Sequence, residues 1–500
     1  MFEAAFEGLS QVLTPNSLGL MCLGVLLGSL VGFLPGIGGP STLAIMLPFV
    51  MTMTDPFPVI ALLVGFDAVG NTASAFTAVL ISVPGSSGSQ ATILDGYPLA
   101  KQGQAMRALS ASFVASLVGG LLGPLVLLAS LPFLRPLVLS FGSPEFFVLT
   151  LWGVTMVGVL SGNVPLKGLL AGILGIFISA VGADDKSGIE RFTFATAYLI
   201  EGIDLVIVAL GMFAIPECID LAARKTTIAE TRELGHGFWE GAKDVFRHWW
   251  LTLRASAIGI WVGFLPGLGS SVADWFAYAH ALQTEKNREN FGKGDIRGVI
   301  AAESSNNAKE AGDYIPTLAF GIPGGTSTAL ILTALIAVGV NPGPEMLTTQ
   351  LSFTFAVIWT LTIANIIAVA ICLLFIKPIS RMCFMPFYSL VPLILVFVFI
   401  GAFAANRTHT DLVALMVFSF LGFLMRRLGW PRSPLVLGMV LGDKMENYLW
   451  LSYGRFGFEW LTRPGVLILF VLLALSLCYP LLQDWKARQR RREREPWADK

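Results

Sequence analysis

The chain has 500 residues, of which 55% are hydrophobic and 13% are charged. Soluble domains carry about 25% charged residues, so this composition indicates a membrane protein with many spans. The formal net charge is zero, so no strongly basic surface points to nucleic acid as a partner. The five cysteines show no paired spacing, and we interpret them as apolar residues rather than as disulfide or metal sites.

The N-terminal stretch has no Lys or Arg through Thr14, so it does not resemble a cleaved signal peptide. Apolar segments of membrane-spanning length follow it. We expect spans near residues 17–34, 57–83, 107–131, 144–161, 164–182, 198–215, 251–282, 299–322, 326–340, 349–376, 386–404, 410–425, 433–450 and 464–483. They predict an all-α polytopic membrane protein with about twelve transmembrane helices, some of them broken or re-entrant.

One unusual phrase occurs twice within apolar sequence. It reads Gly-Phe-Leu-Pro-Gly-Ile-Gly-Gly at residues 32–39 and Gly-Phe-Leu-Pro-Gly-Leu-Gly-Ser at 263–270, an offset of 231. Pro and Gly break helices, and lipid cannot hydrogen-bond the freed backbone groups, so such breaks occur where protein or a water-filled cavity satisfies them. A second pair, Val-Pro-Gly-Ser at 83–86 and Ile-Pro-Gly-Gly at 322–325, lies at an offset of 239. We therefore predict two copies of one unit.

The distribution of Lys and Arg suggests how the copies are oriented. We divide the chain into a first membrane repeat (1–215), a polar linker (216–250), a second membrane repeat (251–483) and a basic tail (484–500). Cytoplasmic loops are enriched in Lys and Arg, so we place the linker and the C-terminal tail in the cytoplasm and the N-terminus outside. The two copies then enter the membrane from opposite sides, which predicts two inverted-topology repeats.

Matching interruptions in two halves of a transporter point to a substrate site near the bilayer midplane. Helix N-termini offer free N–H groups to an anion, Gly permits close approach, and small hydroxyls add donors. Small residues also let transmembrane helices pack closely, which is the alternative explanation. The candidate substrate-binding residues at the breaks are Gly36, Gly38, Gly39, Ser41, Thr42, Gly85, Ser86, Ser87, Gly267, Gly269, Ser270, Ser271, Gly324, Gly325, Thr326 and Ser327.

A coupling cation would need oxygen ligands, such as amide and hydroxyl side chains close to the second breaks. The candidate cation-binding residues are Asp67, Asn71, Thr72, Asn306 and Asn307. Asp67 lies within an apolar span, where an ionisable side chain is functional by default. The alternative explanation is that Asp67 faces a water-filled vestibule. The ion would be Na⁺, or H⁺ if Asp67 or Glu310 carries it.

A denser charged set follows, with Glu303, Lys309, Glu310 and Asp313 on one predicted helix. Lys309 could pair along that helix with Glu303 or with Asp313, which would make the set a neutralised structural cluster. The alternative is that Lys309 is the counter-charge for the anion. We include Lys309 among the candidate substrate-binding residues on that ground.

The sequence carries no convincing enzyme signature. It has no H-E-x-x-H phrase, no nucleotide-binding loop of the form G-x-x-x-x-G-K-[ST], and no paired carboxylates at suitable spacing in the apolar spans. Gly-Lys-Gly-Asp at 292–295 matches the phrase of membrane aspartyl proteases but lies among charged residues typical of a solvated loop. We therefore predict a secondary transporter with no catalytic residues, no cofactor and no metal beyond a sodium ion.

Several phrases resemble the large membrane subunit of the tripartite tricarboxylate transporters, the TctA family. These are the two copies of the repeated phrase, Asp-Gly-Tyr-Pro-Leu-Ala-Lys-Gln-Gly at 95–103, Arg-Phe-Thr-Phe at 191–194, and Asn-Asn-Ala at 306–308 followed by Gly-Ile-Pro-Gly at 321–324. The resemblance runs from Leu18 to the final span.

The resemblance implies a multi-pass subunit of a bacterial inner-membrane permease that imports a di- or tricarboxylate, or a related organic anion, using an ion gradient. It implies two partners, a small four-span membrane subunit of the TctB type and a periplasmic solute-binding protein of the TctC type. A stand-alone carboxylate carrier or a passive anion channel is the alternative. Relatives usually have small residues where this chain has Lys309, Glu310 and Asp313, so the resemblance does not extend to citrate as the substrate.

Overall fold

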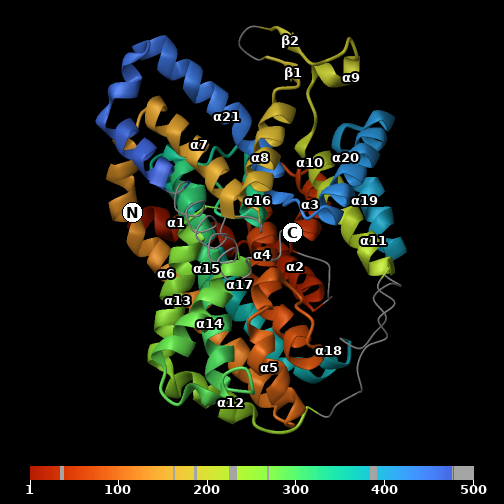
Figure 1. The fold of residues 1–500 in the computed structure, drawn as a ribbon, viewed down its shortest axis with the longest axis vertical. Coiled ribbons are helices and arrows are strands. Elements are labelled where there is room, and N and C mark those ends of the chain that lie inside the picture. The colour runs from red at the N-terminus through yellow and green to blue at the C-terminus, as the bar shows by residue number, and fades with distance from the viewer. Residues whose placement is uncertain are drawn as a thin grey trace, which may run out of the picture. The chain divides into compact units, whose positions relative to one another are not determined.

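The computed structural model describes residues 1–33, 39–160, 164–184, 188–223, 234–266, 270–382, 391–475 and 477. The chain forms two compact units, one of residues 1–138 with 204–424 and one of residues 139–203 with 425–500. Both units are built from helices (Figure 1), and the described residues contain only one pair of two-residue strands. The predicted all-α polytopic class is confirmed.

The larger unit contains most of the described helices; α6 extends one residue beyond it and α20 three residues. Its elements are α1 (Phe2–Val12), α2 (Pro15–Gly32), α3 (Gly39–Val50), α4 (Pro56–Ile81), η1 (Ser87–Ser89), α5 (Thr92–Lys101), α6 (Ala105–Leu139), α10 (Leu205–Ala209), η2 (Leu210–Ala214), α11 (Ile215–Ala223), α12 (Phe238–Arg247), α13 (Trp249–Phe264), α14 (Ser270–Thr284), η3 (Arg288–Asn290), α15 (Ile296–Phe320), α16 (Thr326–Ala337), η4 (Pro344–Leu347), α17 (Leu351–Leu374), α18 (Ile376–Met382), α19 (Val391–Asn406) and α20 (His409–Arg427).

Five helices of the larger unit, α2, α4, α6, α17 and α20, are long and apolar enough to cross a membrane. Shorter apolar helices accompany them, among them α3, α16 and α19. The single span predicted over residues 251–282 is wrong, because the structure has two helices there. α13 ends at Phe264 and α14 begins at Ser270, at the two ends of the second repeated phrase.

The first repeated phrase lies at the end of α2, which packs along α4. An added Cβ at Gly28 would collide with the carbonyl oxygen of Phe66, and one at Gly32 would lie 2.5 Å from the carbonyl oxygen of Gly70. Glycine therefore allows the two backbones to touch. Because the contact positions increase together along both helices, α2 and α4 are parallel, and α2 ends halfway along α4.

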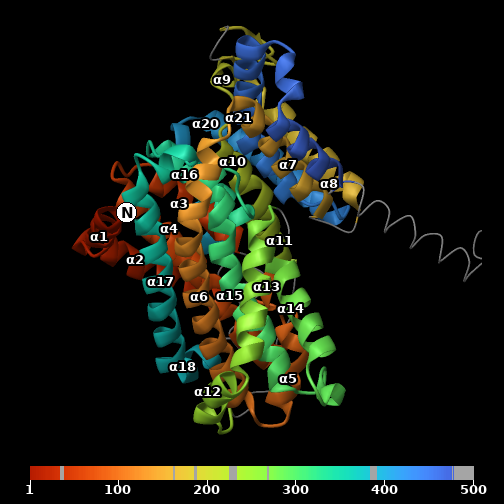
Figure 2. The same cartoon turned by 90° about the vertical axis from the view of Figure 1, so that its left-hand side faces the viewer.

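The second repeated phrase is packed in the same way, at the end of α13. An added Cβ at Gly259 would collide with the carbonyl oxygen of Ser305 in α15, and one at Gly263 would collide with that of Lys309. These contacts lie 231 and 239 positions after those between α2 and α4, which are the offsets of the repeated phrases. Figure 2 shows α13 and α14 side by side, running toward the end that carries α5 and α12.

α4 and α15 cross in antiparallel directions inside the larger unit. Asn71 Nδ2 donates to Glu310 Oε1 at 2.8 Å, and Asn307 Nδ2 donates to Thr72 Oγ1 at 2.7 Å, so partner numbers fall on one helix as they rise on the other. All residues of α15 except Arg297 and Phe320 are buried. Surrounding protein thus shields a helix whose many polar side chains could not face lipid.

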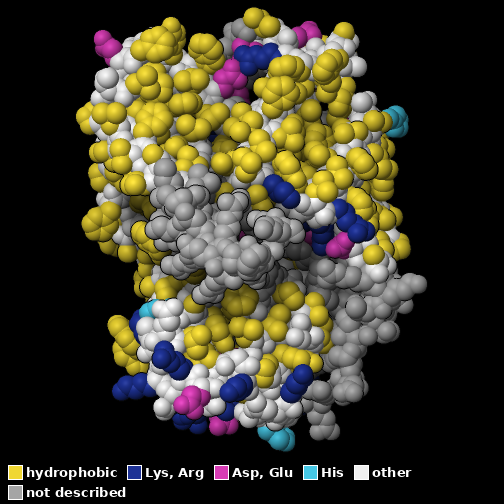
Figure 3. Space-filling model, in the orientation of Figure 1, with side chains coloured by type: hydrophobic (Ala, Val, Ile, Leu, Met, Phe, Trp, Pro, Cys, Tyr) yellow, Lys and Arg dark blue, Asp and Glu magenta, His cyan; other side chains and the backbone are white. Residues whose placement is uncertain are grey.

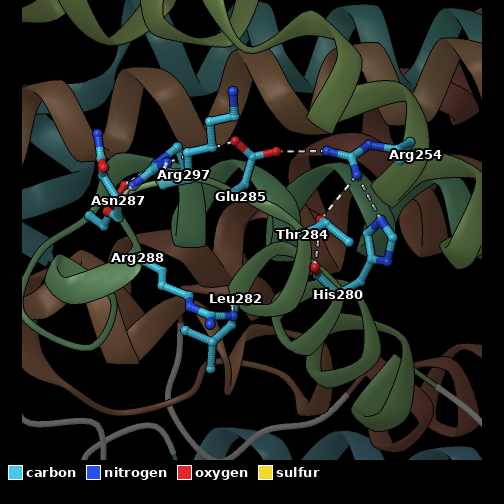
Figure 4. Close-up of polar contacts among 10 residues, drawn as sticks. Arg254, His280, Leu282, Thr284, Glu285, Asn287, Arg288 and Arg297 are labelled. Carbon is cyan, nitrogen blue, oxygen red and sulfur yellow. Dashed lines mark hydrogen bonds and ion pairs between the residues drawn. The ribbon is translucent and has the colours of Figure 1, made fainter.

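Charged side chains connect the beginning of α13 and the end of α14 to the start of α15 (Figure 4). Arg254 of α13 donates to Glu285 Oε1 at 2.6 Å and to Thr284 Oγ1 at 3.0 Å. Arg297 of α15 forms ion pairs with Glu285 at 3.7 Å and with Asp295 at 2.6 Å. The ends of the three helices are therefore held together away from the repeated phrase.

The smaller unit contains α7 (Ser143–Leu160), α8 (Pro165–Ser179), β1 (Gly182–Ala183), β2 (Glu190–Arg191), α9 (Ala197–Ile200), α21 (Ser433–Phe456), η6 (Glu459–Thr462) and the helix Pro464–Leu475. α8 packs closely on α21, since an added Cβ at Gly175 would collide with the carbonyl oxygen of Leu435. Arg191, in the family-like phrase at 191–194, pairs with Glu446 at 2.8 Å and with Asp184 at 3.1 Å. That phrase therefore has a structural role here.

Candidate functional site

The chain breaks of the first half meet residues of both halves beside the crossing of α4 and α15. Gly85, at the second break, has no room for a Cβ because the carbonyl oxygen of Gly32, at the end of α2, lies against it. On the other side of the first break, Gly39 begins α3, and an added Cβ there would lie 3.9 Å from Ser327 Oγ in the first turn of α16. Residues beside the first break of the first half and the last break of the second half thus lie close together, whereas the glycines inside the two repeated phrases lie outside the described residues.

A second contact links α14 of the second half to the segment after the second break of the first half. Ala91 N, just before α5, donates to Asp274 Oδ2 of α14 at 2.9 Å. Asp274 Oδ1 also accepts from its neighbour Trp275 N at 2.8 Å. A carboxylate at the N-terminus of α5 is favoured by the helix dipole, so Asp274 has a structural explanation.

Several predicted site residues lie outside what the structure describes. Gly36, Gly38, Gly267 and Gly269 are not among the described residues, and the side chains of Ser87, Ser270 and Ser271 are not described.

The described hydroxyl groups near the breaks differ in their hydrogen bonding. Ser41 is buried in α3, and the buried Oγ1 of Thr42 has no hydrogen-bond partner among the described residues. Ser86 Oγ lies 3.0 Å from Ser74 Oγ of α4. Thr326 and Ser327 are half-buried at the start of α16. Thr42 is thus a free hydrogen-bonding group next to the first break.

The backbone N–H groups predicted for the anion at the last break are already used. Gly324 N donates to Thr317 Oγ1 at 3.2 Å, and Gly325 N donates to Thr328 Oγ1 at 2.9 Å. An anion at this break would have to displace these hydroxyl acceptors. The beginning of α16 therefore provides fewer free donors than the sequence suggested.

Lys309 is paired along its own helix. Its ammonium group forms an ion pair with Asp313 Oδ2, four residues later. The pair lies against the start of α16, since an added Cβ at Gly325 would be 3.2 Å from Asp313 Oδ2 and 3.7 Å from Lys309 Nζ. This is one of the two pairings that the sequence predicted. The other predicted partner, Glu303, accepts hydrogen bonds elsewhere.

The predicted cation ligands lie on both sides of the helix crossing. Besides the bonds from Asn71 to Glu310 and from Asn307 to Thr72, Tyr314 Oη is 3.4 Å from Asp67 Oδ2. Asn306 is fully buried one turn before Glu310, and within the described part of the chain neither polar atom of its side chain has a hydrogen-bond partner. The structure thus brings these amide, hydroxyl and carboxyl groups into one polar region.

Sequence reasoning missed Asn365 of α17, whose Oδ1 accepts from Asn307 Nδ2 at 2.9 Å. An Asn in an otherwise apolar span was the signal that could have revealed it. An added Cβ at Gly120 would lie 2.5 Å from Asn365, so α6 packs closely over this amide. A third long helix therefore supports the polar region.

Two further acidic residues stabilise the fold around this region. Glu303 accepts from Thr92 Oγ1 at 2.6 Å and from Ser116 Oγ at 3.1 Å, and it is fully buried. Asp95, in the family-like phrase at 95–103, accepts from the backbone N–H groups of Gly294 at 2.9 Å and Asp295 at 2.8 Å. The phrase therefore holds the loop that precedes α15.

Comparison with known proteins gives a family match and two relatives. The family model described as the tripartite tricarboxylate transporter TctA family matches residues 18–437. An uncharacterized 52.8 kDa protein in the TAR-I ttuC′ 3′ region of Agrobacterium vitis is 35% identical over 446 residues, which are 88% of each chain. An uncharacterized protein in the TAR-II ttuC′ 3′ region of the same organism is 36% identical over 191 residues, 38% of this chain and 79% of that protein. No solved structure matches the chain.

Proposed function

Because the chain belongs to the tripartite tricarboxylate transporter TctA family, we propose that it is the membrane subunit that imports a di- or tricarboxylate, or a related organic anion, across the bacterial inner membrane. An ion gradient drives the transport, and a periplasmic solute-binding protein of the TctC type delivers the anion. A small four-span subunit of the TctB type completes the complex. No enzymatic step and no cofactor belong to this function.

The observation that carries the proposal is the arrangement around the crossing of α4 and α15. α2 and α13 end beside the middle of these buried helices, and they pack there through the same glycine contacts at the same offsets. The crossing helices are antiparallel. Asn71 donates a hydrogen bond to Glu310, and these two residues lie 239 positions apart in the chain. The same offset separates the second breaks of the two halves. Such a relation supports two inverted-topology repeats with the substrate at their interface.

The distribution of charge supports an orientation for the repeats. Figure 3 shows Lys and Arg side chains, with some Asp and Glu side chains among them, gathered at the end of the larger unit that carries α5 and α12. The positive-inside rule supports a cytoplasmic position for that end. The base of the α13–α14 pair would then face the cytoplasm and the N-terminus the periplasm, while the basic tail is placed in the cytoplasm by its own Lys and Arg residues.

Anion binding would use the helix ends next to the first break. The N-terminus of α3 presents backbone N–H groups with a favourable dipole, and Gly39 leaves the backbone accessible. Thr42 supplies a hydroxyl group that has no partner among the described residues. Ser327 of α16 lies close to Gly39. Donors from both halves would then surround the carboxylates, together with the predicted residues of the second repeated phrase.

Uptake into proteoliposomes tests the proposal. The vesicles would contain both membrane subunits with the cognate binding protein outside, and would be supplied with labelled di- and tricarboxylates under separately imposed Na⁺ and pH gradients. We expect saturable uptake that requires the binding protein and one of the two gradients. Saturable uptake without the binding protein would instead identify a stand-alone carrier, and non-saturable flux would identify an anion channel.

A further inference from the structure

Helix α15 carries buried oxygen atoms that no hydrogen-bond donor among the described residues reaches. Oδ1 of Asn306, Oδ1 of Asn307 and Oε2 of Glu310 have no such partner, and each of these side chains is at most 3% exposed. Asp313 also has an Oδ1 without a hydrogen-bond partner, but Lys309 already supplies its counter-charge. Asn306 and Glu310 are one turn apart and share a helix face, with Asn307 beside them. Buried acceptors are unfavourable without partners, so this group of oxygens is suited to a positively charged ligand.

Bonds to neighbouring helices hold two of these three side chains in place. Glu310 Oε1 accepts from Asn71 of α4 at 2.8 Å. Asn307 Nδ2 donates to Thr72 of α4 at 2.7 Å and to Asn365 of α17 at 2.9 Å. These bonds occupy one polar atom of each side chain and leave Glu310 Oε2 and Asn307 Oδ1 for a ligand. A ligand there would lie where three long helices meet.

The charges around Glu310 are unbalanced. Its charged neighbours are Asp67, Lys309 and Asp313, and Lys309 already pairs with Asp313. Asp67 and Glu310 therefore have no positive partner of their own among these neighbours. A carboxylate buried in a membrane protein without a counter-charge is strongly unfavourable. A cation bound to Glu310 would supply the compensating charge.

We propose that Glu310, Asn306 and Asn307 bind one sodium ion, and that this ion couples the transport proposed above, on which the inference rests. Carboxylate and amide oxygens are the ligands that hard cations prefer. A proton on Glu310 would give one O–H donor and satisfy only one of the two amide oxygens, whereas a sodium ion contacts several oxygens at once. Of the ligands predicted from the sequence, the assignment keeps Asn306 and Asn307, adds Glu310, and leaves out Asp67, Asn71 and Thr72; Asn71 and Thr72 instead hold Glu310 and Asn307 in place.

Sodium binding by the purified full chain in detergent tests the site without any carboxylate. The thermal unfolding temperature would be measured in NaCl and in choline chloride at equal ionic strength. We expect NaCl to raise this temperature for the wild-type protein, because a ligand that binds only the folded state stabilises it. Glu310→Gln should abolish the sodium-specific increase.

Glu303→Gln is the matched control. Glu303 lies on the same helix and is equally buried, but both of its oxygens accept hydrogen bonds, from Thr92 and Ser116. This variant should keep the sodium-specific increase, whatever its absolute unfolding temperature. Asn306→Leu is a second variant, because Asn306 makes no hydrogen bond that the substitution would remove. We expect it to weaken sodium affinity about tenfold or more.

The site is overturned by a sodium-specific increase that persists in both Glu310→Gln and Asn306→Leu, or by a wild-type unfolding temperature that responds to pH and not to sodium. Failures of the two proposals can be told apart. A chain that binds sodium through Glu310 but imports no carboxylate contradicts the proposed function alone. Sodium-driven uptake by Glu310→Gln contradicts the site alone.

Discussion

At the scale of single residues, the polar side chains inside the larger unit fall into two groups. Glu303, Asp95 and Asp274 have all or most of their hydrogen-bonding capacity filled by hydroxyl or backbone groups, and they hold helices and loops together. Asn306 and Glu310 keep atoms without partners. Native proteins pair nearly all buried polar atoms, so the second group is where ligand binding is expected.

The role of Lys309 can be decided by a pair of variants. Lys309→Met should destabilise the protein by about 3 kcal/mol or more, because it leaves the Asp313 carboxylate buried without its counter-charge. The double variant Lys309→Met with Asp313→Asn should recover most of that stability. Thermal unfolding in detergent measures both effects.

Uptake by the same double variant separates the two interpretations of Lys309. If the pair is structural, stability and uptake recover together in proteoliposomes. If stability recovers while carboxylate uptake stays abolished, the pair has more than a structural role, which supports the interpretation that Lys309 acts on the anion.

At the scale of helices, the glycines that allow close helix packing also determine where the helix breaks lie. The alternative explanation for the glycines, helix packing, holds for Gly32 and Gly263, which begin the two repeated phrases and touch α4 and α15. Such contact places the ends of α2 and α13 beside the polar middle of the buried helices. Packing glycines therefore position the breaks.

Two glycines of α2 provide a matched test of this packing. Gly28→Val would push α2 away from the backbone of α4, whereas a Cβ added at Gly19 of the same helix meets no atom within 4 Å. Overpacking costs about 1–3 kcal/mol, occasionally more. We expect Gly28→Val to lower the unfolding temperature and the uptake rate, and Gly19→Val to change neither. Equal behaviour of the two variants would contradict the packing described for α2 and α4.

At the scale of the whole molecule, sequence repeats and packing units divide the chain differently. The repeats predicted from the sequence follow one another along the chain, whereas each packing unit combines segments from both halves. Residues 139–203 pack with residues 425–500, and the two crossing helices α4 and α15 lie together in the larger unit. Because α4 and α15 lie against each other, the polar residues in the middle of each helix are buried by the same contact.

Accessibility of introduced cysteines tests the orientation of the two halves. Thr52 lies in the exposed connection between α3 and α4, and Asn287 lies in the exposed loop after α14. In a cysteine-free background, an impermeant maleimide added to whole cells with a permeabilised outer membrane should label Thr52→Cys. It should label Asn287→Cys only after the inner membrane is opened. Labelling of both from the same side would refute the inverted repeat.

Much of the fold was predictable because its signals are local. Apolar segments, the Pro-Gly breaks and the drift between offsets 231 and 239 can be read directly from the chain. The pairing of Lys309 with Asp313 was also predictable, since residues four apart on a helix are neighbours. The division of 251–282 into two helices was missed in the span prediction because hydropathy does not register a short break within an apolar segment.

The sequence by itself determined the membrane class, the family and the duplicated interruptions, because composition and helix-breaking residues act over short distances. Only the tertiary structure decided which polar residues meet. Asn71 reaches Glu310, and Asn307 reaches Asn365, because of the register in which helices far apart in the chain cross and pack. That register depends on the packing of helices that are far apart in the chain, so no single motif could reveal the oxygen atoms without partners on α15.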